Sequence, residues 1–137
     1  MQICYRNIFA RSLINIIKQT VNKKVILKIA LSDTISEDKY FQLIDDTFSI
    51  YEITIKQPSP HFIKNRKQLE TFSKQYRLLL NQIQATHGKD CELFILPAMP
   101  ISFAVECGRV ILPTKDPHIF VCEYFADKGF KKVLEIN

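Results

Sequence analysis

The sequence has only three glycines and no Trp, and it lacks several motifs that identify an activity directly. Neither a G-x-G-x-x-G fingerprint nor a P-loop is present, so a glycine-rich phosphate cradle is excluded. The four cysteines form no C-x-x-C pair and have no His nearby in a zinc-binding pattern. No run reaches the roughly eighteen apolar residues that a membrane span needs, and no signal-peptide core is present. We therefore expect a cytoplasmic protein with free thiols.

The chain has 137 residues, a length that predicts a single domain over 1–137 with its own hydrophobic core. Its net charge of +5 is unevenly distributed. Residues 1–32 carry six basic and no acidic side chains, 33–52 are acidic, and 53–90 are basic again. The two basic segments are consistent with an anionic partner, and equally with solvated helix surfaces.

The apolar pattern predicts strands that alternate with helices. Ile8, Leu13 and Ile16 share one helical face, so we expect an N-terminal helix within 1–23, ahead of a Rossmann-like body over 24–137. In that body we expect strands at 24–31, 50–56 and 91–96, helices ending near 46, 88 and 107, and closing strands at 110–112, 118–125 and 132–136. This order predicts an α/β fold with a mainly parallel sheet flanked by helices and antiparallel strands at the C-terminus.

Three polar segments directly follow the predicted parallel strands, namely 32–36, 57–59 and 97–102. In an open α/β sheet, ligands bind outside the carboxyl ends of the strands. A helix N-terminus there presents unpaired amide groups that suit a phosphate. Helix capping alone also accounts for Ser32, Asp33, Ser36 and Ser102, and the pattern by itself favours that simpler role.

No catalytic or metal-binding set can be assembled from the sequence. His61, His87 and His118 are far apart, and each fits a surface or helix-end position. No nucleophile can be paired with a base by spacing, so we predict no catalytic residue and no metal ligand.

The segment from Leu93 to Arg109, LFILPAMPISFAVECGR, carries the most specific pattern in the chain. A hydrophobic strand runs into a Pro-Ala-x-Pro turn, and a helix rich in small residues then closes on Gly-Arg. This resembles the signature near the end of SAVED domains, although Leu96 stands where that family often has Phe. Further matches are Thr34-Ile35, Phe72, Tyr76-Arg77, His87-Gly88 and Val133 to Ile136. The resemblance covers roughly Lys24 to Asn137.

SAVED domains resemble two fused CARF-like Rossmann halves, and the chain is similar to the C-terminal half. The resemblance implies a prokaryotic sensor that binds a cyclic di-, tri- or tetranucleotide in CBASS or type III CRISPR antiviral defence. Binding would drive assembly and activate an effector, here a possible separate protein. A second copy or partner chain would complete the pocket, and no cofactor is expected besides the ligand.

The same resemblance implies a set of ligand-binding residues on two loops and one helix end. These are Ser32, Asp33, Thr34, Pro97, Ala98, Met99, Pro100, Ser102 and Arg109. Arg109 could pair a phosphate bidentately, and it could equally fix the end of its helix onto the sheet.

Two other functions remain open at this point. The first is a ring nuclease that cleaves the cyclic ligand, in which Ser32, Thr34, Ser102 and Lys115 could only position a ribose hydroxyl, since no general base is evident. The second is an interaction subunit that binds no ligand and docks a partner through its apolar N-terminal helix. We expect neither membrane association nor direct DNA or RNA binding, because no motif for them is present.

Overall fold

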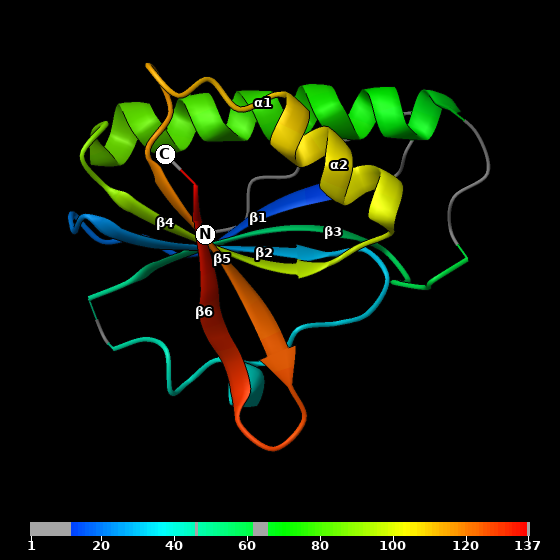
Figure 1. Ribbon diagram of the computed structural model, residues 1–137, viewed down its shortest axis with the longest axis horizontal. Coiled ribbons are helices and arrows are strands. Elements are labelled where there is room, and N and C mark those ends of the chain that lie inside the picture. The colour runs from blue at the N-terminus through cyan, green and yellow to red at the C-terminus, as the bar shows by residue number, and fades with distance from the viewer. Residues whose placement is uncertain (1–11, 46, 62–65, 137) are drawn as a thin grey trace.

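A six-stranded mixed sheet forms the centre of the protein (Figure 1). The structure is a computed structural model that describes residues 12–45, 47–61 and 66–136. The strand order is β1-β3-β2-β4-β5-β6. The strands are β1 Ser12–Lys18, β2 Lys24–Ala30, β3 Ser49–Ile55, β4 Glu92–Ala98, β5 His118–Phe125 and β6 Gly129–Ile136.

The four inner strands are parallel, and one antiparallel strand closes each edge. β2 pairs in parallel with β3 and β4, and β4 pairs in parallel with β5. β1 and β6 are the antiparallel edges, on β3 and β5 respectively. Six of the seven residues of β2 are buried, as expected for a strand covered on both faces. The predicted α/β fold class is confirmed.

Among the described residues, two α-helices lie on one face of the sheet, and the segment that carries a short 3-10 helix covers the other (Figure 1). The helices are α1 Arg66–His87 and α2 Ile101–Arg109, and the 3-10 helix is η1 Glu37–Lys39. Phe72, Tyr76 and Leu79 lie on the buried stripe of α1. α1 ends before Gly88, whose φ of +92° favours glycine. Within the described residues, neither helix is long and apolar enough to cross a membrane.

The sheet separates two hydrophobic clusters. Under the helices, residues such as Leu27 and Tyr51 pack against α1 and α2. On the opposite face, Phe94 stacks on Phe120 with 5.0 Å between ring centroids. Ile35, Tyr40 and Phe48 reach this second cluster from the segment around η1. The expected apolar core is therefore present on both sides of the sheet.

The predicted N-terminal helix is wrong for its described part. Residues 12–18 form β1, which pairs with β3, and Ile14 and Ile16 alternate into the core. Leu13 and Ile16 fit a helical spacing, but the segment forms a strand with alternating burial because it can pair with β3, which has no other neighbour on that side among the described strands. The first eleven residues of that prediction lie outside the described residues.

Two further predicted elements differ from the structure. The helix expected up to residue 46 shrinks to η1, three residues long. The strand expected at 110–112 is instead part of the turn that leads into β5, where Leu112 N–H donates to Asp116 Oδ2 at 2.7 Å. Gly108 lies inside α2 and does not end it.

Candidate functional site at the carboxyl ends of the parallel strands

The connections that leave β2 and β4 run in opposite directions across the sheet. The chain continues from β2 to β3 on one side, and from β4 through α2 to β5 on the other. Since β2 and β4 are neighbours, their connections diverge at the carboxyl ends and form a topological switch point. Ligands of open α/β sheets bind at this position.

Backbone hydrogen bonds join the three loops at this edge. The amides of Leu31 and Ser32, after β2, both donate to the Ala98 carbonyl at the end of β4, at 2.9 and 2.8 Å. The Ser59 amide, after β3, donates to the Leu31 carbonyl at 3.0 Å. The three polar segments that follow the strands in the sequence therefore meet at one edge, as predicted.

The loop after β2 presents polar groups to solvent while its backbone is held from below. Asp33 and Thr34 are exposed, and the Asp33 carboxylate accepts from the Thr34 amide at 2.8 Å. The buried Lys28 ammonium donates to the Ile35 carbonyl at 3.1 Å. A polar, exposed loop on a fixed backbone suits the recognition of a polar ligand.

The turn after β4 places the N-terminus of α2 beside this loop. Pro97, Met99 and Pro100 are half-buried, and Pro100 is the N-cap residue of α2. Among the described residues no side chain caps the helix, and the amides of Phe103 and Ala104 donate to the Pro100 carbonyl at 3.0 and 3.1 Å. The amides of Ile101 and Ser102 precede the first bond of the helix and are not used by it. Ser102 is exposed in that first turn. Amide donors and a hydroxyl are thus available to an anion here.

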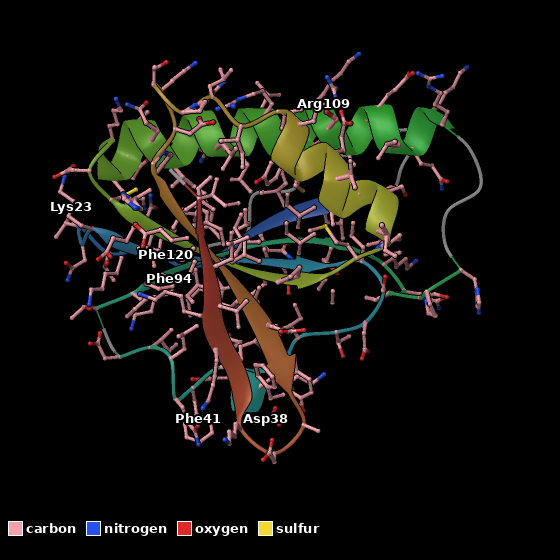
Figure 2. The ribbon with its side chains drawn as sticks, viewed as in Figure 1. Lys23, Asp38, Phe41, Phe94, Arg109 and Phe120 are labelled. Carbon is pink, nitrogen blue, oxygen red and sulfur yellow. The ribbon has the colours of Figure 1, made fainter. Side chains whose placement is uncertain are left out.

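Arg109 is the one predicted ligand residue that the structure does not bring to these loops. It is the last residue of α2, about 12 Å along the helix from Ile101. Figure 2 places Arg109 beside α1. Its guanidinium donates to both carboxylate oxygens of Glu106, at 2.9 and 2.5 Å, and Ser73 also donates to Glu106. These hydrogen bonds lower the pKa of Glu106 to about 2. The ligand role of Arg109 remains a prediction.

Lys115 also lies away from the candidate site at the carboxyl ends of β2 and β4. It belongs to the turn before β5, and β5 begins beside the first residue of β4, at the amino ends of the parallel strands. The structure therefore does not assemble the set that a ring nuclease would use. Among the described residues, no three His, Cys, Asp or Glu side chains are grouped as metal ligands.

The family assignment follows from comparison with known sequences. The model of the SAVED family, the SMODS-associated and fused to various effectors sensor domain, matches residues 10–136. The chain belongs to the SAVED family. No curated protein sequence matches it.

Solved structures of SAVED proteins share this fold. The chain resembles the Acinetobacter baumannii Cap4 SAVED/CARF-domain containing receptor with the cyclic trinucleotide 2'3'3'-cAAA, with a TM-score of 0.73 at 14% identity over 96% of this chain. A second Cap4 receptor structure gives a TM-score of 0.63 at 14% identity over 94% of the chain. The chain spans only 29% and 27% of the length of those receptor chains.

One residue of this SAVED chain contacts the loop after β2 although no ligand role was predicted for it. Lys39 of η1 donates to the Thr34 carbonyl at 3.1 Å. Lys39 falls within the helix predicted up to residue 46, and local patterns do not reveal its contact with Thr34, because that contact depends on how the chain folds back after Ile35. The only available signal was that Lys39 is the single base in an acidic stretch.

Proposed function

We propose that this chain is the ligand-binding part of a sensor for cyclic oligonucleotide second messengers in antiphage defence. The observation that carries the proposal is the meeting of the loops after β2 and β4 at the topological switch point of a SAVED fold. The similarity in fold to a receptor whose structure contains a cyclic trinucleotide supports the same class of ligand for this chain.

A second copy of the chain, or a partner chain, completes the pocket in this proposal. The loops after β2, β3 and β4 lie together at the carboxyl ends of the parallel strands and supply one wall of the pocket. The neighbouring receptor chains are more than three times as long, so they have further chain with which to enclose a ligand. Ligand binding would then bring chains together and pass the signal to a separate effector.

The first test measures thermal unfolding of the purified chain with cyclic di-, tri- and tetraadenylates and their linear forms. A ligand that binds only the folded state, present at about 100 times its Kd, adds roughly 2.7 kcal/mol. For a chain of this size the melting temperature should rise by several degrees. A rise with one ring, and none with its linear form, is the expected result. The absence of a rise with every ring would refute binding by this chain alone.

A charge at the helix N-terminus tests the location of the site. Ser102→Asp places a carboxylate among the first-turn amides of α2, where it stabilises the helix dipole but repels a phosphate. We expect affinity for the ring to fall at least about tenfold with no loss of melting temperature. Thr114→Asp is the matched control, since Thr114 is exposed in the turn before β5, at the amino ends of the parallel strands. Equal affinities of the two variants would show that the ligand binds elsewhere.

Chromatography of the ring after incubation separates a sensor from a ring nuclease. A sensor leaves the ring intact, whereas a ring nuclease yields a linear product above the level of a sample without protein. Sedimentation with and without the ring tests assembly, and we expect a larger particle only when the ring is present.

A further inference from the structure

Lys39 holds a position between the candidate loop and the β5–β6 hairpin. Its ammonium donates to the Thr34 carbonyl at 3.1 Å and lies 3.8 Å from the Asp33 carboxylate. It also lies 5.6 Å from the centre of the Tyr124 ring. Figure 2 shows Asp38, the preceding residue, near the tip of the hairpin. The side chain of Lys39 is 26% exposed, so solvent reaches it.

The backbone of Lys39 is fixed on both sides. On the loop side its amide donates to the Ser36 carbonyl at 3.0 Å. On the hairpin side Gly129 has a φ of +76°, and a Cβ there would lie 2.5 Å from the Lys39 carbonyl oxygen. Glycine at 129 therefore permits a close approach that holds η1 against the hairpin. A fixed backbone limits where the ammonium can go, which keeps it near the loop.

The ammonium of Lys39 is incompletely engaged in this arrangement. A lysine ammonium has three donors, and its distance of 3.8 Å to Asp33 exceeds that of a hydrogen bond. The Asp33 carboxylate is 73% exposed, so water screens the pair and the attraction is weak. Lys28, beneath the same loop, differs because its buried ammonium already binds the Ile35 carbonyl and Glu52.

We infer that Lys39 is a phosphate-binding residue of the candidate site, and that its ammonium exchanges Asp33 for a phosphate oxygen of the ligand. The inference rests on the proposed function, because the phosphate belongs to the cyclic oligonucleotide. A phosphate competes well with Asp33, since charge-assisted hydrogen bonds are stronger than a screened pair beyond hydrogen-bond distance. Asp33 then acts as an internal anion that occupies Lys39 in the absence of ligand.

This exchange predicts effects of opposite sign at two contacting residues. Lys39→Met removes the cation and should weaken binding of the ring between about tenfold and hundredfold. Asp33→Asn removes the competing charge and should strengthen binding several-fold. Its amide oxygen can still accept from the Thr34 amide, so the loop keeps its shape. A ligand that instead binds the Asp33 carboxylate directly would lose affinity in Asp33→Asn.

The experiment titrates wild type and variants with whichever cyclic adenylate gives the largest thermal shift, over a series of salt concentrations. Lys39→Met should bind more weakly and with a shallower dependence on salt, because one cation–phosphate pair is lost. Lys39→Arg should keep most of the affinity. Lys89→Met is the matched control, since Lys89 is an exposed lysine between α1 and β4, at the amino ends of the parallel strands, and its loss removes the same charge. Its affinity should change less than about threefold.

The outcomes separate this inference from the proposed function. If wild type binds no ring, ligand binding by this chain alone is refuted, and the inference about Lys39 fails with it. If wild type binds and Lys39→Met binds equally well with the same salt dependence, the function stands and the role of Lys39 is refuted. A loss of affinity in Asp33→Asn would also refute the exchange. Circular dichroism and melting temperature identify any variant that is misfolded, and Asp33→Asn still decides the question in that case.

Discussion

Replacing Lys28 with Met should destabilise the fold by about 3 kcal/mol, because it leaves a carboxylate without its cation. Lys28 and Glu52 lie on neighbouring strands with side chains only 7% and 16% exposed, and their charged atoms are 3.4 Å apart. The same ammonium donates to the Ile35 carbonyl at 3.1 Å and lies 5.3 Å from the Tyr40 ring. After the substitution, Glu52 keeps the hydrogen bond that Asn15 donates at 2.9 Å but has lost the cation that balanced its charge.

The magnitude follows from the burial of both groups. Breaking a buried ion pair by removing one partner costs about 3–5 kcal/mol, and we take the lower value because Glu52 keeps some contact with solvent. For a chain of this size, about 3 kcal/mol lowers the melting temperature by roughly 10 °C. The double variant Lys28→Met/Glu52→Gln removes both charges and should cost only about 1 kcal/mol.

Urea unfolding of the two single variants and the double variant measures this coupling. Glu52→Gln keeps an amide oxygen that can accept from the Lys28 ammonium and should cost about 1 kcal/mol, so we expect a coupling free energy of about 3 kcal/mol between Lys28 and Glu52. Lys24→Met is the control, since Lys24 is an exposed residue of the same strand, and it should cost under about 1 kcal/mol. The reasoning is refuted if Lys28→Met is as stable as wild type, or if the double variant is less stable than both single variants.

Two further predictions concern buried titratable groups. Burial lowers the pKa of His87 below 6.5, so the unfolded chain binds a proton more readily than the folded one. The contribution of His87 to the free energy of unfolding is therefore complete above pH 6.5 and is lost as the pH falls below it. Urea unfolding between about pH 5 and 7.5 should show this decrease in stability with falling pH, and the decrease should be smaller in His87→Gln. Burial raises the pKa of Cys107 to about 12 and of Cys91 and Cys122 to about 11. In a Cys4→Ser background these thiols should resist a disulfide reagent at about pH 8 until urea unfolds the chain, and rapid labelling of the folded protein would contradict their burial.

Local patterns predicted the inner strands and α1, because each has one dominant period and clear breakers. They failed at β1, where Leu13 and Ile16 fit a helix while Ile14 and Ile16 fit a strand. The partner that decides between them, β3, begins more than thirty residues later. The helix predicted for the segment around η1 was wrong for a related reason. Ile35, Tyr40 and Phe48 all reach one hydrophobic cluster, and their spacing does not fit one face of a helix.

The candidate edge could be predicted because the carboxyl ends of parallel strands always meet. That rule predicts that the loops containing Ser32 and Pro97 lie side by side, and the hydrogen bonds from Leu31 and Ser32 to Ala98 confirm it. It could not place Arg109 or Lys39, whose positions depend on helix length and on a chain reversal. Nor could it find the ion pair between Arg77 and the buried Asp116, which lie 39 residues apart in sequence and join α1 to the turn before β5.

The contacts of the loop after β2 bear on how a signal could leave this site. The loop is already held by Ala98 through two backbone bonds, by Lys28 at Ile35, and by Lys39 at Thr34. A loop ordered before binding spends little free energy on its own reorganisation, so more remains for affinity. The same order limits how far the chain can move when the ligand arrives, since the exchange at Lys39 displaces only an exposed carboxylate. A site of this kind signals most effectively by offering its bound ligand as a surface to a second chain, and this is why assembly, more than a change within one chain, is the output we expect.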